Sequence, residues 1–221
     1  MTTYTCPEGQ ALKDLASHQM EVIRDDGVHR HIRFRRPNTT SMWFDLITWN
    51  GTLCIDGDMG THVFRRIEDM FEFFRSGEVG EQLRINPGYW AEKLRAISDY
   101  GKGYEEFDSE RFRQRVKETF DSWCEENGPV DGEAEPDEIA DFTAQKNALW
   151  DEIDDDVLYY ADEGEIRAID AALRFTCHET DFNFDDAWEW RCKQFTYHYI
   201  WCCYAIVWGI QQYDKSKAAA A

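Results

Sequence analysis

The apolar residues of this chain change their spacing near residue 65, from every second position to every third or fourth. Up to residue 64 the alternation predicts strands at 28–36, 41–49 and 52–56. Asn50-Gly51 is a strong hairpin signal, because both residues accept the positive φ angles of a tight turn. With shorter strands before and after these, we expect an antiparallel sheet of four or five strands within residues 20–64.

From Ile67 onward the apolar residues recur at helical spacing. Asn86-Pro87 is typical of an N-cap followed by a first-turn proline, and it predicts a helix with Trp90, Leu94 and Ile97 facing inward. Three further helices are predicted by the stripes Phe112, Val116, Phe120 and Trp123, then Ile139, Phe142, Leu149, Ile153, Val157 and Tyr160, then Ile166, Ile169, Leu173 and Cys177. A short amphipathic helix at 12–18 precedes the sheet.

The last predicted helix runs from about Asp185 to Tyr213 and is apolar nearly all round, which is typical of a buried central helix. We therefore expect an α+β fold, with the N-terminal antiparallel sheet of four or five strands followed by a helical region packed around this C-terminal helix. Segment 195–210 carries more aromatic surface than one helix usually needs. The rest of the chain can cover it, but we favour a homodimer formed through this surface.

Length and composition, 221 residues with 43% apolar, predict one domain or two closely packed parts. We expect a sheet-containing region with helices at 1–128, a linker rich in Gly, Pro and acid at 129–136, and an acidic helical region at 137–214. Residues 215–221 lack a packing pattern and are expected to be a disordered tail or an artificial extension.

The longest apolar run, Phe195–Ile210, is shorter than the ~20 residues that span a bilayer. The first ten residues resemble no secretory signal. We expect a cytoplasmic protein that does not bind membranes. The seven cysteines are odd in number and include no C-x-x-C pair, so the sequence predicts neither a disulfide framework nor a zinc site, and no cofactor.

Acidic residues are concentrated in one block. Residues 131–189 hold 20 Asp or Glu against three basic residues, a net charge of −17 out of −20 for the chain. Residues 1–75 are nearly balanced, with 11 acidic and 9 basic residues. Because such a field repels nucleic acid and attracts basic surfaces, we expect a basic protein surface as the partner and no direct binding of nucleic acid.

The block has the apolar spacing of a folded helix, and its carboxylates fall on the remaining circumference. Those expected to bind the partner are Asp137, Glu138, Asp141, Asp151, Glu152, Asp155 and Asp156. Asp151 with Asp155, and Glu152 with Asp156, are like-charge pairs four residues apart, each costing roughly 0.2–0.5 kcal/mol. A sequence that tolerates such costs is keeping the charge for use; the alternative is a solvated face that only keeps the protein soluble.

An enzyme is the alternative functional class. Carboxylates at a strand end hold the divalent cation of metal-dependent hydrolases of nucleotides or nucleic acid, and the candidates here are Asp45, Asp56, Asp58 and His62. Alternation along 29–35 also places His29, His31, Arg33 and Arg35 on one strand face, a basic stripe that suits a phosphate. Asp-Gly is ordinary turn chemistry, however, and the stripe is better explained as a solvated face or by pairing with the protein's own acidic helices.

Three segments carry a resemblance to known proteins: 44–49 (FDLITW), 57–61 with 69–74 (GDMGT and DMFEFF), and 205–213 (AIVWGIQQY). They look like segments of small uncharacterised acidic proteins encoded by tailed bacteriophages. The resemblance spans most of the chain and transfers no catalytic residue. It implies an inhibitor of a bacterial defence system, of the anti-CRISPR or anti-restriction type, acting in the host cytoplasm. With the acid block, it predicts a DNA mimic that binds the nucleic-acid-binding surface of a host protein or complex.

Overall fold

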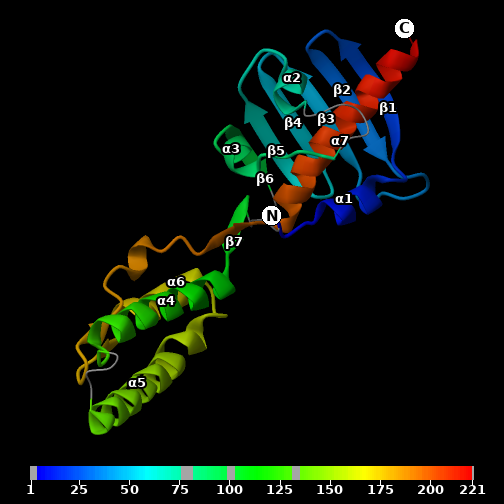
Figure 1. Ribbon diagram of the computed structural model, residues 1–221. Coiled ribbons are helices and arrows are strands. Elements are labelled where there is room, and N and C mark those ends of the chain that lie inside the picture. The colour runs from blue at the N-terminus through cyan, green and yellow to red at the C-terminus, as the bar shows by residue number, and fades with distance from the viewer. Residues whose placement is uncertain (1–3, 76–81, 99–102, 131–134, 221) are drawn as a thin grey trace. The chain divides into compact units, whose positions relative to one another are not determined.

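The computed structural model describes residues 4–75, 82–98, 103–130 and 135–220. The chain forms two compact units (Figure 1): a sheet unit of residues 1–106 and 195–221, and a helical unit of residues 107–194. The fold class is α+β, as predicted, with an N-terminal antiparallel sheet followed by helices and a C-terminal helix.

The sheet is an antiparallel meander of six strands in sequential order: β1 (Gln19–Asp26), β2 (His29–Arg35), β3 (Phe44–Trp49), β4 (Thr52–Gly57), β5 (Gly60–Arg65) and β6 (Leu94–Ser98). The Asn50-Gly51 hairpin is confirmed, with Trp49 paired to Thr52 and Gly51 at φ +70°. In β2, Ile32 and Phe34 face the core. His31 and Arg33 therefore lie on the opposite face of the sheet.

The sixth strand corrects one prediction. The helix begun by Asn86-Pro87, α3 (Pro87–Ala91), ends before Leu94, and residues 94–98 pair with β5. Trp90, Leu94 and Ile97 fit a helical stripe, but the open edge of β5 offers this segment backbone hydrogen bonds, and edge pairing satisfies both strands. Local spacing alone does not reveal that edge.

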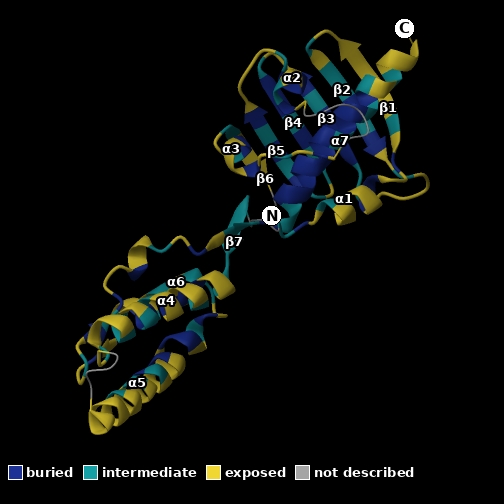
Figure 2. Ribbon diagram, viewed as in Figure 1, coloured by how far each residue is buried: buried dark blue, intermediate teal, exposed yellow. Residues whose placement is uncertain are grey.

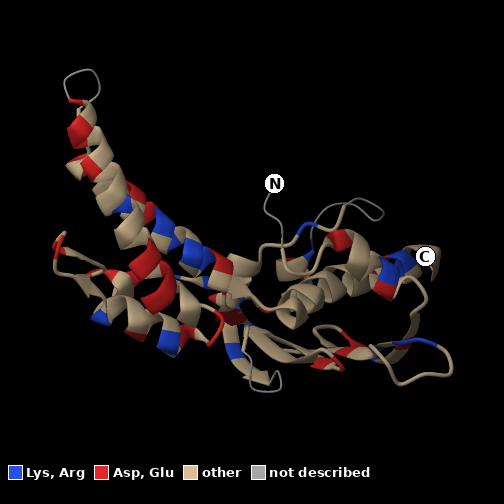
Figure 3. Cartoon of the chain, turned by 90° about the horizontal axis from the view of Figure 1, so that it is seen from below, with Lys and Arg blue, Asp and Glu red and all other residues tan. Residues whose placement is uncertain are grey.

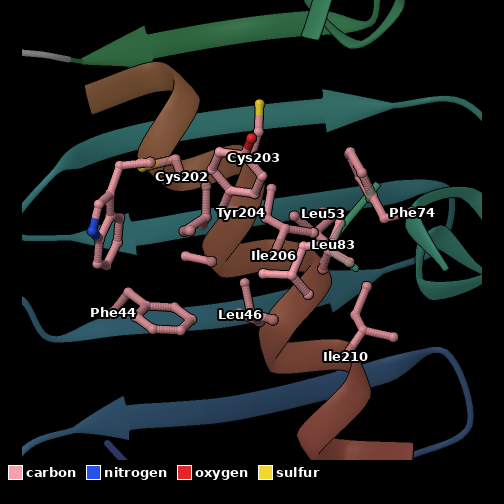
Figure 4. Close-up of a cluster of buried hydrophobic side chains, with 14 of the residues drawn as sticks. Phe44, Leu46, Leu53, Phe74, Leu83, Cys202, Cys203, Tyr204, Ile206 and Ile210 are labelled. Atoms are coloured by element: carbon pink, nitrogen blue, oxygen red, sulfur yellow. The ribbon is translucent and has the colours of Figure 1, made fainter. Parts of the chain in front are cut away.

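α7 (Tyr197–Ala220) is the buried helix of the sheet unit and contacts β5, α1 (Glu8–Leu15) and α2 (Met70–Phe74). Most of its residues up to Tyr213 are buried (Figure 2), and its side chains interdigitate with those of the sheet (Figure 4). At Gly209 a Cβ atom would lie 2.8 Å from Leu46 Cδ1 and 3.1 Å from Phe34 Cε2, so the glycine permits the close approach of α7 to the strands.

The limits of α7 differ from those predicted. It begins at Tyr197 rather than near residue 185, because residues 185–195 form the short helix η2 (Ala187–Glu189) and the strand β10 (Lys193–Phe195). It also continues to Ala220, so residues 215–220 are helical and not a disordered tail. Four consecutive alanines are strong helix formers, which accounts for the extension.

The helical unit contains α4 (Ser109–Asn127), α5 (Pro136–Asp156), η1 (Leu158–Tyr160), α6 (Glu165–Arg174), η2 and the small hairpin β8 (Thr176–Cys177) with β9 (Phe182–Asn183). Its hydrophobic core draws on α4, α5, α6 and the β9 region, for example Phe112, Ile153, Ala168 and Phe182. The strand β7 (Glu105–Phe107) pairs with β10 where the chain passes from one unit to the other.

This division replaces the predicted domain boundaries. The helices of the helical unit were expected to pack around the C-terminal helix, but their core contains no residue of α7, which packs on the sheet instead. The segment 129–136 connects α4 to α5 inside one unit and is not a linker between domains; its residues 131–134 lie outside the described part. An all-round apolar helix indicates burial but does not indicate against which element.

Candidate functional site

The two units differ in charge. The helical unit holds 26 acidic and 9 basic residues, a net charge of −17, whereas the sheet unit holds 18 and 15, a net of −3. The acidic block predicted from the sequence therefore coincides with a separate folding unit (Figure 3). Strong charge on one unit and near neutrality on the other give the chain a strongly polarised field.

Within the helical unit, α5 gathers the predicted partner-binding carboxylates on one face. At 100° per residue, all seven fall within about 140° of the helix circumference. Leu149 and Ile153 are buried just beyond the edge of this face that Glu138 and Asp156 form, and all seven carboxylate residues are exposed. We call these seven residues, Asp137, Glu138, Asp141, Asp151, Glu152, Asp155 and Asp156, the acidic face.

The acidic face is divided into two clusters. Three carboxylates lie in the first two turns and four in the last two, and the turns between them present Ala144, Gln145 and Ala148 on the same face. From Asp141 to Asp151 the separation along the axis is about 15 Å at 1.5 Å per residue. Glu138 also accepts a hydrogen bond from the backbone N–H of Glu135 and completes a capping box that begins the helix.

The carboxylates of the acidic face are not neutralised by neighbouring cations in the described part of the chain. Among the residues that the structure describes, no ion pair includes any of the seven carboxylates. Some other acidic residues of the unit are paired: Asp162 with Arg113 at 2.6 Å, Glu163 with Arg167 at 2.6 Å and Asp170 with Arg174 at 2.9 Å. The acidic face therefore presents charge that nearby residues leave uncompensated.

A groove of about 510 Å³ borders the C-terminal cluster of the acidic face. Glu152 and Asp156 of α5 line one side of it, and Arg167, Asp170 and Arg174 of α6 line the other, with further lining from Tyr160, Ala171, Phe175 and Thr176. No local sequence pattern indicated this groove, because it depends on how α5 and α6 pack. It offers a partner both carboxylates and aromatic surface.

The residues of the alternative enzyme site do not converge. Asp45 is buried and accepts two hydrogen bonds from Arg33, at 2.9 and 2.8 Å, and lies 2.7 Å from Nε2 of His31. Burial raises the pKa of this carboxyl group, but the hydrogen bonds from Arg33 and His31 outweigh burial and hold the pKa below its usual value. These contacts occupy three of the roughly four lone-pair sites of the carboxylate.

The other three candidates have structural roles as well. Asp56 lies beside Asp45 in the sheet register and accepts a hydrogen bond from the Thr61 hydroxyl. Asp58 accepts one from the backbone N–H of Met42 at 2.7 Å, and His62 points to the core, where its ring centroid is 5.5 Å from that of Tyr199. In the described ranges no group of three His, Cys, Asp or Glu residues is placed to hold a metal ion.

The basic stripe of β2 is compensated by acidic residues of the same unit. Arg33 and His31 contact Asp45, and Arg35 lies 3.4 Å from Glu21 on the adjacent strand. Arg30, on the other face, donates two hydrogen bonds of 2.8 Å to Asp69, the N-cap of α2. The expectation that the stripe pairs with the acidic helices was wrong, because its acidic partners are residues of the neighbouring strands β1 and β3.

The cysteines are free thiols, and five of the seven are buried. Burial raises the pKa of the Cys6 and Cys54 thiols to about 11, so these groups are protonated and unreactive at neutral pH. In the described part of the chain, no helix is both long enough and apolar enough to cross a membrane.

Comparisons with known proteins found no match to a family model, to a curated protein or to a solved structure. Function is therefore inferred from the residues of this chain.

Proposed function

We propose that this protein inhibits a host-defence system by protein–protein binding, presenting its acidic face to the nucleic-acid-binding surface of the target. The supporting observation is that seven exposed carboxylates share one face of α5 and are unpaired among the described residues. The phage class follows from the sequence resemblance. The polyanionic surface is independent of that resemblance and supports the choice of a basic partner.

The dimensions of the acidic face suit a phosphate backbone. From Asp137 to Asp156 the helix extends about 28 Å, and seven charges over this length give one per roughly 4 Å. One strand of duplex DNA has a phosphate every ~3.4 Å along the axis. The face therefore approximates the charge density of one strand over about eight nucleotides, with a gap between its two clusters.

The helical unit holds this array in a fixed arrangement. Leu149 and Ile153 anchor α5 in the core, and the capping box fixes its first turn. A rigid array loses little conformational entropy on binding, whereas a disordered acidic tail would lose much more. This distinguishes the face from a disordered acidic tail.

The proposal is tested by capture from a bacterial lysate on the immobilised full-length protein, with duplex DNA as competitor. Nucleic-acid-binding proteins should be retained at low salt, released by the competitor and lost as salt rises, because the contacts replace phosphate contacts. The test variant is D137N/E138Q/D141N/D151N/E152Q/D155N/D156N, in which a glutamine at position 138 can still complete the capping box. This variant should capture none of the nucleic-acid-binding proteins.

The matched control, E21Q/E68Q/E92Q, neutralises three exposed carboxylates of the sheet unit. It is compared with D137N/E138Q/D141N, a triple variant of the first cluster of the acidic face. Both remove three charges from the chain. Retention should fall for the α5 triple variant and stay at the parent level for the control. Equal capture by the parent and the sevenfold variant, with both folded by circular dichroism, would rule out mimicry.

A further inference from the structure

α6 exposes two of its three larger apolar residues. Ala168 and Ala172 are completely buried, whereas Ile166 is 86% exposed and Leu173 45% exposed. Ile166, Ile169 and Leu173 lie within about 60° of one another around the helix; Ile169, at the edge nearest Ala172, is partly buried and packs against the core, whereas Ile166 and Leu173 face away from it. We call these three residues the aliphatic stripe. A helix that served packing alone would bury its Ile and Leu side chains in preference to alanine.

A tryptophan on a neighbouring element is also exposed. Trp188 belongs to η2, which packs beside α6, and its side chain is 67% exposed. Exposed apolar residues scattered singly are ordinary, but several on adjacent elements of one unit are typical of an interaction site. Tryptophan is also among the residues most enriched at the energetic centres of protein interfaces.

The charges around the stripe define the partner. A second copy would bring two units of net charge −17 together, which the field of the unit opposes. Arg167 and Arg174, which are paired with Glu163 and Asp170, line the α6 side of the groove. Glu152 and Asp156, which have no ion pair among the described residues, line its α5 side. A complementary partner surface is therefore apolar where it meets the stripe and basic at the edge that faces the groove.

We infer that the aliphatic stripe with Trp188 is a docking site for a basic amphipathic helix of the target protein. Apolar residues of that helix would cover Ile166, Ile169 and Leu173, while its Lys or Arg residues would reach Glu152 and Asp156. This inference rests on the proposed function, which it deepens. It also supplies specificity, because a polyanion alone attracts any basic surface, whereas an apolar centre selects among them.

The test uses two labelled synthetic helical peptides of equal length and charge. One carries Leu on one face and Lys on the other, and in the second each Leu is replaced by Gln. Fluorescence anisotropy measures their binding to the full-length protein. The Leu–Lys peptide should bind at least about tenfold more tightly than the Gln–Lys peptide. To the I166S/L173S variant the Leu–Lys peptide should bind only as tightly as the Gln–Lys peptide does, and the affinity of the Gln–Lys peptide should be unchanged.

The matched control is V22S/I23S in the sheet unit, since each of these side chains is 46% exposed. It should change neither affinity. A second variant, W188A, removes an exposed side chain outside α6. It should lower the affinity of the Leu–Lys peptide and leave that of the Gln–Lys peptide unchanged. Unchanged thermal denaturation of I166S/L173S shows that the unit remains folded, as expected for substitutions of solvent-exposed residues.

Two outcomes would overturn the docking site. One is equal binding of the Leu–Lys peptide by the parent and I166S/L173S. The other is light scattering that shows a dimeric parent and a monomeric variant, which would make a second copy the occupant. The sevenfold α5 variant is measured in parallel. If the sevenfold variant no longer binds the Gln–Lys peptide, the polyanionic function is supported even where the docking site is disproved. If it still binds that peptide, the result counts against the polyanionic function but not against the docking site.

Discussion

At the scale of single residues, Asp45 has neighbours that exclude the role its chemistry suggested. Its carboxylate is 4% exposed and receives both nitrogens of the Arg33 fork as well as the His31 ring. Sequence alone placed Asp45 on a strand near other carboxylates. It did not show that Arg33 lies directly opposite in the register of β2 and β3, a long-range property of the sheet.

The Asp45→Asn substitution should lower the free energy of unfolding at pH 7 by about 1–3 kcal/mol, because Arg33 and His31 lose a charged acceptor. The folded pKa of Asp45 lies below its ordinary value of ~3.9. The carboxylate therefore stabilises the fold fully above that value, and its contribution disappears as pH falls through the folded pKa. Urea denaturation at pH 7 and near pH 2 measures this.

The exposed Asp26→Asn substitution is the control and should change stability by less than about 0.5 kcal/mol at either pH. A penalty for Asp45→Asn that is as large at acid pH as at pH 7 would show that the loss comes from packing rather than from charge.

At the scale of elements, local signals identified the strands up to β5 and most helices, because each depends on neighbours in sequence. The Asn50-Gly51 turn and the apolar positions of α4 are such cases. Which face of a helix is buried was harder to predict from the sequence. In α6, Ala168 and Ala172 are as regularly spaced as Ile166 and Leu173, and only the packing of the unit decides which pair is buried.

The C-terminal cluster of the acidic face should lower the stability of α5. Asp151 with Asp155 and Glu152 with Asp156 are exposed pairs on a continuous helix, and the last turn has no basic residue to complement the macrodipole. The D151N/E152Q/D155N/D156N variant should therefore be more stable than the parent by about 0.4–1 kcal/mol. Urea denaturation at low salt measures the gain, which should shrink at high salt.

The E21Q/E68Q/E92Q variant serves as the control and should show no comparable gain, because its three carboxylates are not neighbours on one helix. If the quadruple variant is more stable but no longer captures basic proteins, the four carboxylates serve binding at the cost of stability. Lower stability in that variant would mean that these carboxylates support the helix.

At the scale of the whole molecule, the division of the chain was the least predictable feature. The chain leaves the sheet unit after Glu106, forms the helical unit and returns at Phe195 to complete the first core with α7. Sequence order placed α7 beside the acidic helices, and no local pattern marks a return of this length. The charge block was easier to predict because a folding unit is continuous in sequence there, from 107 to 194.

Because the chain returns to the sheet unit at Phe195, α7 is covered within one chain, and we expect a monomer. The predicted homodimer was based on the apolar surface of 195–210, but Tyr199, Trp201 and Ile206 are completely buried within the sheet unit. A second copy is not needed to cover them, and the charge of −20 per chain opposes association. Light scattering at physiological salt should give a monomer of 26.1 kDa over a wide concentration range. Twice that mass in the parent, falling to the monomer mass in I166S/L173S, would place a second copy on the aliphatic stripe.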